Sequence, residues 1–367
     1  MILSIIEKSL IVLLRIEKEF LMSVITVQGL KNENDLGIIS PHEHIFIDIR
    51  NQADIYTEAD KAALSEERVS ITNLGVLSRN PYAVKDNLVL NNVQLAEKEL
   101  LYFKNMGGNT IVDATPKDIG RDPLALYRIS KSLDLNIIAG TGYYTQDTHC
   151  HGVNSLTTEE ISKKIEKEIL EGMDNTQIRA GVIGEIGLSK GILDNEKKVL
   201  KAAGIAQKEK GTGVLIHTYP WSRDGIKALN ILEETGCEIG KICICHIDID
   251  IDLEYCINLC SRGAYIEFDN FGKEYYLSKK GDGFAGGAFA RDIERVRAIK
   301  VLINKGFINN ILVSNDICLK ILLHAYGGWG YDHIITNIRP MMLDEGISQE
   351  EIDLLYKENP KKFLNIE

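Results

Sequence analysis

The chain alternates between short apolar runs and longer stretches whose apolar residues recur at helical spacing. Eight of the short runs read as strands buried on both faces, at residues 36–40, 109–115, 136–142, 179–187, 213–218, 241–247, 263–269 and 310–316. Amphipathic stretches such as 91–107, 159–173, 195–211 and 225–236 predict helices between them. This alternation predicts an α/β fold, a single-domain (β/α)8 TIM barrel. A doubly wound open sheet is the alternative, but no GxGxxG follows the first strand.

Residues 1–22 precede the first strand-like segment and have an amphipathic pattern of their own. Their longest apolar run, LIVLL, is too short to span a bilayer. No small-residue cleavage site follows, so we expect neither a signal peptide nor a membrane anchor. We predict a short helical N-terminal extension at 1–22, with Met22 as an alternative start, and one barrel domain at 23–367.

Composition and charge narrow the class of protein. The 367 residues carry a formal net charge of −11, which argues against nucleic acid or an anionic membrane as the main partner. Hydrophobic residues make up 44% of the chain and charged residues 26%, proportions typical of globular proteins. The seven cysteines are scattered rather than arranged as a disulfide framework, which favours a reducing compartment and a cytoplasmic location.

Polar residues gather where the predicted strands end, the region that surrounds the active site in a (β/α)8 barrel. They are His42, His44, Asp113, Tyr143, Tyr144, Glu185, His217, His246, Asp269 and Asp316. Four of the chain's eight histidines fall at the ends of three strands, which is not expected of isolated core histidines. Imidazole and carboxylate groups suit zinc and its neighbours in the transition series. Their number exceeds the needs of one tetrahedral ion and predicts a site for two divalent metals.

Side-chain alternation along a strand sorts these residues further. His42 and His44 share one face, so Glu43 between them points away, and we expect it to be replaceable without loss of metal. By the same rule Cys243 and Cys245 lie opposite His246 and should point toward the outer helices as small buried residues. Asp113 and Asp269 are expected to hydrogen-bond to ligands rather than to bind metal.

The motifs at these strand ends resemble those of a known family. SPHEHIFID, NTIVDATPKDIGRD, AGVIGEIG, IHTYP, CHIDID, VSNDI and YGGWGYDHI are similar, in order from about residue 26 onward, to the phosphotriesterase-related family of the amidohydrolase superfamily. The resemblance implies two divalent metals, usually zinc, although such sites also accept manganese, cobalt or iron. It implies that His42, His44 and Asp316 bind the more buried metal and that His217 and His246 bind the more exposed one. A bridging ligand and a bridging hydroxide would join the two.

The bridging position departs from the pattern of many family members. They place a carboxylated lysine after AGxI on the fourth strand, where this chain has Gly184. GEIG resembles a subset that bridges with the neighbouring glutamate, here Glu185. A glutamate offers two oxygens and the same charge as a carbamate. Because Glu185 lies one residue further along, the strand must twist or bulge to aim it inward.

The reaction that this resemblance implies is metal-assisted hydrolysis. Water bound to such metals ionises near neutral pH, and Asp316 is expected to be catalytic by passing its proton to the leaving group. The expected substrate is a small carboxylic ester or lactone, with promiscuous phosphoester or phosphonate hydrolysis. The alternatives are a sugar-phosphate lactonase, cleavage of an amide or phosphodiester, and a non-catalytic metal-binding barrel. Relatives are commonly dimers, so a homodimer is left open.

Substrate contacts are expected from the loops after the strands. Tyr144 is preferred to Tyr143 as the tyrosine that faces the metals, and His149 and His151 are expected at the pocket rim. Five basic residues could bind an anionic group, with a solvated basic loop as the alternative: Arg223, Lys273, Lys279, Lys280 and Arg291. The glycine-rich segment 272–295 is long enough to be a lid.

Overall fold

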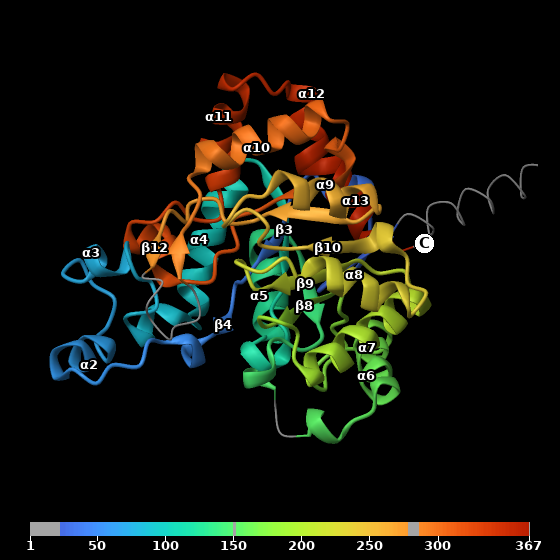
Figure 1. The fold of residues 1–367 in the computed structure, drawn as a ribbon, viewed down its shortest axis with the longest axis horizontal. Helices are drawn as coiled ribbons and strands as arrows, with labels where there is room; N and C mark the ends of the chain where they lie inside the picture. The colour runs from blue at the N-terminus through green and yellow to red at the C-terminus, as the bar shows by residue number, and fades with distance from the viewer. Residues whose placement is uncertain (1–22, 150–151, 278–285, 367) are drawn as a thin grey trace, which may run out of the picture.

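A single curved sheet of eight parallel strands forms the centre of the molecule (Figure 1). The computed structural model describes residues 23–149, 152–277 and 286–366. The strands are β3 (Ile38–Glu43), β6 (Gly108–Asp113), β7 (Asn136–Thr141), β8 (Val182–Leu188), β9 (Val214–Thr218), β10 (Ile242–Ile244), β11 (Tyr265–Phe268) and β14 (Ile311–Val313). Each overlaps one of the runs predicted as strands, and neighbours in the sheet follow one another along the chain. The predicted (β/α)8 barrel is therefore confirmed.

The barrel closes at a seam between its first strand, β3, and its last, β14. These two strands are the ends of the hydrogen-bonded strand order, and they are joined by hydrogen bonds outside the regular β-ladders. The backbone N–H of His42 donates to Oγ of Ser314 (3.1 Å), and the N–H of Asp316 donates to the carbonyl of His42 (3.2 Å). The seam thus lies directly beside predicted metal ligands.

Helices connect the strands and cover the outside of the barrel (Figure 1). The connecting helices are α4 (Val93–Asn105), α5 (Pro123–Leu133), α6 (Thr158–Leu170), α7 (Asp194–Lys210), α8 (Gly225–Glu233), α9 (Leu253–Ser261) and α10 (Asp292–Asn304). Side chains cap their first turns: Asn92 accepts from Leu95 N, and Thr157 forms a capping box with Glu160. The C-terminal part holds α11 (Arg339–Asp344), α12 (Gln349–Asp353) and α13 (Asn359–Leu364), with π-helical turns at Ile334–Ile338 and Leu354–Glu358.

Three small two-stranded sheets add to the barrel. The hairpin of β1 (Ser23–Thr26) and β2 (Gly29–Asn32) places Val24 in the apolar cluster inside the barrel. The pair β4 (Ile47–Asp48) and β5 (Val89–Leu90) frames an insertion that carries α2 (Ala59–Ser65) and α3 (Leu74–Leu77) and projects to the left in Figure 1. The pair β12 (Tyr276–Leu277) and β13 (Gly287–Ala288) lies within the predicted lid segment.

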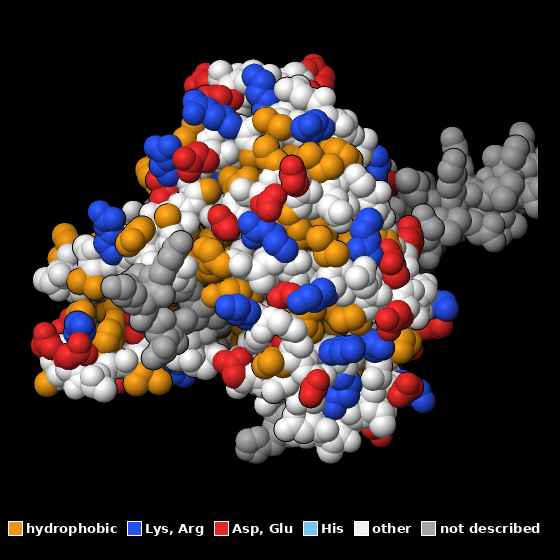
Figure 2. Space-filling model, in the orientation of Figure 1, with side chains coloured by type: hydrophobic (Ala, Val, Ile, Leu, Met, Phe, Trp, Pro, Cys, Tyr) orange, Lys and Arg blue, Asp and Glu red, His pale blue; other side chains and the backbone are white. Residues whose placement is uncertain are grey.

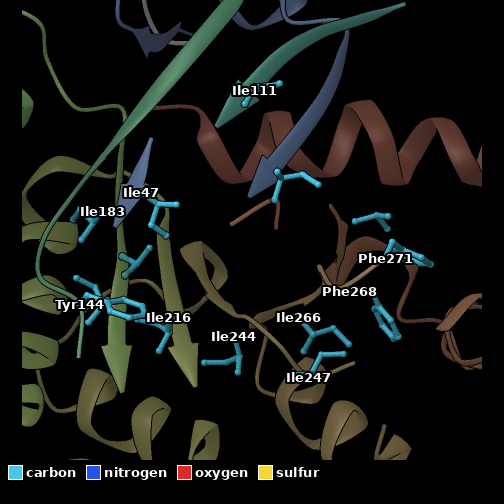
Figure 3. Packing of buried hydrophobic residues seen from close by; sticks show 14 of the residues in the cluster. Ile47, Ile111, Tyr144, Ile183, Ile216, Ile244, Ile247, Ile266, Phe268 and Phe271 are labelled. Atoms are coloured by element: carbon cyan, nitrogen blue, oxygen red, sulfur yellow. The ribbon is translucent and has the colours of Figure 1, made fainter. Parts of the chain in front are cut away.

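Apolar side chains pack on both sides of the barrel wall. Figure 3 shows part of the larger cluster, with Ile183, Ile216 and Ile244 of the barrel strands. The same cluster contains residues of the surrounding helices, among them Leu200 of α7 and Leu229 of α8. The smaller cluster fills the barrel and takes side chains from its strands, among them Leu215 and Leu312. Such double-sided burial explains why the strand sequences are apolar without alternation.

Cys243 and Cys245 belong to the cluster inside the barrel, so the prediction that they face the outer helices was wrong. That prediction extended strand alternation as far as His246. β10 ends at Ile244, however, and His246 has a left-handed backbone with φ of 62°. In a regular strand, His246 would point outward because its neighbour Cys245 points inward. The left-handed turn instead brings the imidazole of His246 toward the barrel mouth.

Charges of both signs are mixed on the surface. Figure 2 shows Lys and Arg side chains interspersed with Asp and Glu over one face. Among the helices of the described residues, none combines the length and apolarity that crossing a membrane requires.

Candidate metal centre

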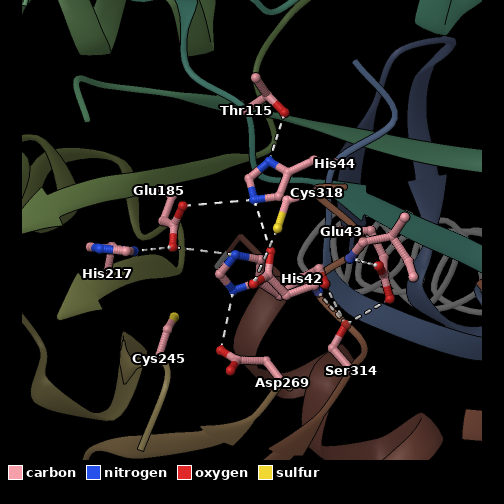
Figure 4. A network of polar contacts seen from close by, with 12 residues as sticks. His42, Glu43, His44, Thr115, Glu185, His217, Cys245, Asp269, Ser314 and Cys318 are labelled. Carbon is pink, nitrogen blue, oxygen red and sulfur yellow. Dashed lines mark hydrogen bonds and ion pairs between the residues drawn. The ribbon is translucent and has the colours of Figure 1, made fainter. Parts of the chain in front are cut away.

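Six side chains from the ends of five strands converge at the C-terminal rim of the barrel. Figure 4 shows four of them, His42, His44, Glu185 and His217, close to one another. His42 lies in β3, Glu185 in β8 and His217 in β9, while His44, His246 and Asp316 follow β3, β10 and β14. All six are buried. The structure therefore brings together every residue that the sequence predicted as a metal ligand.

Glu185 lies at the centre of this cluster. Its Oε1 is 2.8 Å from Nε2 of His246 and 3.1 Å from Nδ1 of His217. The same oxygen is 3.4 Å from Nε2 of His42, and Oε2 is 3.7 Å from Nε2 of His44. Ligand atoms of Glu185, His217 and His246 lie within 4.8 Å of one another, as do those of Glu185, His42 and His44. One carboxylate thus belongs to both ligand groups, as a bridging ligand must.

The fourth barrel strand departs from regular pairing where it aims Glu185 inward. The register between β8 and β9 shifts between Ile183 and Ile186, which is the bulge that the sequence required. Gly184 has φ of 131°, and a Cβ there would lie 2.6 Å from the carbonyl oxygen of Leu215. Position 184 therefore excludes any side chain, the bridging lysine of many relatives included.

Asp316 adds a second carboxylate to the ligand group formed by His42, His44 and Glu185. Its Oδ1 is 3.2 Å from Nε2 of His44. Nε2 of His42 is fully enclosed, and no hydrogen-bond partner for it exists in the part of the chain that the structure describes. A buried nitrogen aimed at carboxylates and other imidazoles is the donor expected of a metal ligand. The residues present therefore fit a pair of divalent metals.

Further side chains hold the second ring nitrogens of the histidines. Nδ1 of His246 is 3.0 Å from Asp269 Oδ1, and Nδ1 of His44 is 2.8 Å from Thr115 Oγ1. Such partners fix the orientation of a ligating imidazole. This agrees with the supporting role expected of Asp269. Asp113 accepts from the N–H of Ile45 (2.8 Å) and from Thr115, and so holds the turn after His44.

Glu267 was missed by sequence reasoning. It is fully buried inside the barrel, with Oε2 3.1 Å from Nδ1 of His42 and 3.3 Å from Sγ of Cys245. The signal was present, because a glutamate within the apolar run YIEF is unusual for a strand buried on both faces.

Electrostatics keep the central carboxylates ionised. Burial opposes the charge of Glu185, but His217 and His42 hold its pKa well below the ordinary value. Burial also opposes the charge of Asp316, but Lys273 and His44 lower its pKa. The pKa of His42 rises to about 10, since the attraction of Glu185 and Glu267 outweighs burial. Ionised carboxylates are the form that binds metal.

A cavity opens onto the cluster. Much of its wall is apolar or aromatic, from Ile47, Ile49, Tyr82, Pro220, Ile249, Tyr275, Phe289 and Leu319. Tyr144 lines this cavity, with its hydroxyl 3.2 Å from Nδ1 of His217 and 3.5 Å from Nε2 of Gln52. Tyr143 lines a different cavity, so the preference for Tyr144 agrees with the structure.

Lys273 also reaches the cavity. Its side chain is 5% exposed, and its ammonium contacts the carboxylate of Asp316 and lies 3.7 Å from Sγ of Cys318. In the described ranges it is the single lysine or arginine among the residues that line this cavity. A buried ammonium is costly unless it is paired or used for recognition.

Arg223 does not line the cavity, so the structure does not place it where a substrate-binding role requires. Its guanidinium pairs with Asp250 (3.1 Å) and Asp252 (3.2 Å) and lies over the ring of Tyr255. Sequence reasoning placed Arg223 in the loop after His217, near the start of a helix, and position in a loop does not determine where a side chain points.

The remaining predicted residues lie outside the cluster. Nε2 of His149 is 2.8 Å from the carbonyl oxygen of Tyr144, a contact that holds the loop. Arg291 pairs with Glu294 on the surface at the start of α10. His151, Lys279 and Lys280 lie outside the described residues.

Comparison with known proteins reveals relatives that span almost the whole chain. N-acetyltaurine hydrolase of Danio rerio is 37% identical over 344 residues, which cover 92% of this chain and 97% of the relative. The Homo sapiens enzyme of the same name is 36% identical with the same coverage. A crystal structure of a resiniferatoxin-binding protein from Rhodobacter sphaeroides matches with a TM-score of 0.90 and 32% identity. It covers 94% of this chain and 95% of its own.

The fold and the site together define the class: a hydrolase barrel with a candidate metal centre at its mouth. The model of the phosphotriesterase family matches residues 22–364, and the chain belongs to this family of the amidohydrolase superfamily. The resemblance seen in the sequence motifs is therefore confirmed.

Proposed function

We propose that the protein is a metal-dependent amide hydrolase that cleaves a small N-acylated substrate bearing an anionic group, such as N-acetyltaurine. The observation that carries this proposal is the buried ammonium of Lys273 in a largely apolar cavity beside the metal centre. N-acetyltaurine has a sulfonate a short distance from its amide, and two relatives at 36–37% identity bear the name of its hydrolase.

Lys273 is held in place before any substrate binds. Its backbone N–H donates to the carbonyl of Asn270 (3.0 Å), and its own carbonyl accepts from Arg295 (3.0 Å). Arg295 is fully buried and pairs with Asp248 and Asp292, both at 2.9 Å. Since an ammonium has three donors, the contact with Asp316 leaves others for an anion. A fixed cation binds such a group at low entropic cost.

Two divalent metals at this site would polarise the scissile carbonyl and lower the pKa of the attacking water. Zinc suits the imidazole and carboxylate donors, with manganese, cobalt and iron as alternatives. We assign the metals to His42, His44 and Asp316 on one side and to His217 and His246 on the other, with Glu185 shared. Tyr144 would orient the acyl oxygen through its hydroxyl. Asp316, kept ionised by Lys273, would carry a proton to the leaving nitrogen.

Hydrolysis of a carboxylic ester or lactone is the second candidate. The same attack on an acyl carbon serves both kinds of bond, and the apolar wall of the cavity can accept a neutral ring or chain. The two candidates differ in whether the substrate must carry an anion.

The test compares zinc-loaded and chelated protein on matched substrates. The panel holds N-acetyltaurine, its carboxylate analogue N-acetyl-β-alanine, neutral N-acetylpropylamine, p-nitrophenyl acetate and a γ-lactone. We expect zinc-dependent cleavage of the two anionic amides. In Lys273→Met the KM for N-acetyltaurine should rise about tenfold or more, because the variant loses one charged hydrogen bond to the substrate. Lys320→Met is the matched control, because Lys320 pairs with Asp86 (2.6 Å) and does not line this cavity.

Other results would overturn the proposal. A higher kcat/KM for the lactone or the ester than for either amide would favour the second candidate. Equal rates for the neutral and anionic amides would remove the role given to Lys273. Equal rates with and without chelator would contradict a metal-dependent enzyme of either kind.

A further inference from the structure

Glu43 is the last residue of β3, between the ligand histidines His42 and His44, and its side chain points away from theirs. The sequence predicted that this residue could be replaced without loss of metal. Its side chain is fully buried, however, and it faces the seam between β3 and β14 rather than solvent (Figure 4). A buried carboxylate is costly unless donors surround it, so its partners reveal what it does.

The carboxylate of Glu43 accepts hydrogen bonds mainly from the segment that directly follows the last strand, β14. Oε1 accepts from the backbone N–H of Asn315 (3.0 Å), its side-chain amide (3.0 Å) and the hydroxyl of Ser314 (3.1 Å). Oε2 accepts from the backbone N–H of Ile317 (2.7 Å). Ser40, on the same strand as Glu43, donates a further bond to Oε1 (2.7 Å). One side chain of the first strand therefore binds three of the four positions that follow the last strand, Ser314, Asn315 and Ile317.

These donors flank Asp316 on both sides. Asp316 has φ of 49°, in the left-handed region that non-glycine residues adopt only when their surroundings hold them there. Glu43 binds the N–H before this residue and the N–H after it, while the N–H of Asp316 itself donates to His42 (3.2 Å). All three amides are thus tied to β3, and the carboxylate of Asp316 is left to face the metal site.

We propose that Glu43 is the positioning residue for Asp316, and that it fixes the ligand set of the more buried metal across the barrel seam. This inference rests on the proposed two-metal site. Residues that support metal ligands in this way affect metal affinity about 10–100-fold when they are changed. The HEH sequence then has two functions: the histidines bind metal, and the glutamate between them holds a ligand from the other end of the chain.

The direct test is Glu43→Gln, which keeps the size of the side chain but replaces one acceptor oxygen with an amide donor. The dissociation constants of two Zn²⁺ ions are measured by competition with a chromophoric chelator, together with the Tm of the metal-free protein. We expect one Zn²⁺ to bind about 10–100-fold more weakly, with a smaller change for the other.

Two further variants make the result specific. Ser40→Ala keeps the carboxylate but removes one of its donors, so it should weaken the same Zn²⁺ by a smaller factor, and it carries the test if Glu43→Gln does not fold. Glu196→Gln is the matched control: Glu196 is fully buried and accepts from the backbone N–H groups of Ser189 and Leu193, both at 2.9 Å. It should lower the Tm without changing either dissociation constant.

The outcomes separate the inference from the function on which it rests. If the wild-type protein binds no Zn²⁺, the proposed function fails and the inference fails with it. If the wild type binds two Zn²⁺ ions and Glu43→Gln and Ser40→Ala bind both equally well, only the inference is overturned. A lower Tm with unchanged affinities would assign Glu43 to barrel closure alone.

Discussion

The two walls of the metal site aim their ligands by different means. On the β8–β9 wall the backbone does so: the register shift between Ile183 and Ile186 turns Glu185 inward. On the β3–β14 wall neighbouring side chains do so. Glu267 contacts His42, Thr115 contacts His44, and Glu43 binds the amides that flank Asp316.

This difference determines which substitutions can test each wall. A ligand aimed by a strand bulge has no supporting side chain to remove, so the ligand itself is the only position to change. A ligand aimed by buried carboxylates depends on residues that never touch the metal. The predictions below use this contrast.

The largest effect is expected at Glu185, the residue shared by both ligand groups. Glu185→Gln removes a charge that lies within 3.7 Å of four histidine rings. We expect both metals to bind more than about 100-fold more weakly, beyond the range of a supporting residue. Zn²⁺ content after dialysis and kcat/KM are the measurements, with Glu196→Gln as control. Retention of two tightly bound Zn²⁺ ions would contradict a bridging role.

An intermediate effect is expected at Glu267, on the wall supported by side chains. Glu267→Gln loses the charge beside Nδ1 of His42 (3.1 Å), and we expect Zn²⁺ to bind about 10–100-fold more weakly. The control is Glu99→Gln. Glu99 is buried and accepts from the N–H groups of His324 and Ala325, both at 2.9 Å. If Glu267→Gln bound Zn²⁺ as tightly as the wild type and the control do, the ligands on the β3–β14 wall would not depend on supporting side chains.

The smallest effect is expected below the metal site, at Cys245. Its thiol lies in the apolar cluster inside the barrel, 3.3 Å from Glu267. Cys245→Ala removes one small buried group, so the free energy of unfolding should fall by about 0.5–1.5 kcal/mol while Zn²⁺ affinity changes little. Urea unfolding of the metal-free protein measures this. A loss of Zn²⁺ affinity as large as that of Glu267→Gln would show that the thiol belongs to the metal site.

The barrel and its ligand set could be predicted from sequence because both follow local rules. Strands buried on both faces are continuous apolar runs, and the residues that end them meet at one rim. His217 shows this most simply, since it lies within a regular strand and needs no other structure to face the centre. The bulge at Glu185 was predicted in another way, because this glutamate lies one residue beyond the position that holds the bridging lysine in many relatives.

The errors arose where direction depends on residues far away in sequence. Alternation misplaced Cys245 because the backbone turns at His246, and the turn depends on contacts with Asp269 of the next strand. The surroundings of Glu43 were likewise not visible in the sequence, where alternation showed only that it points away from the two histidines and predicted that it could be replaced without loss of metal. Its partner is the turn around Asp316, which only the closed barrel brings into contact with it.

The seam also bears on how the protein is made. Ser40 and Ser314, which meet there, are 274 positions apart in the chain, so almost the whole barrel must be assembled before they touch. Contacts of such long range form late and slowly. A metal held jointly by His42 and Asp316 would bind only those chains whose last strand has docked onto the first. Its binding free energy would therefore stabilise finished barrels and not partly folded ones.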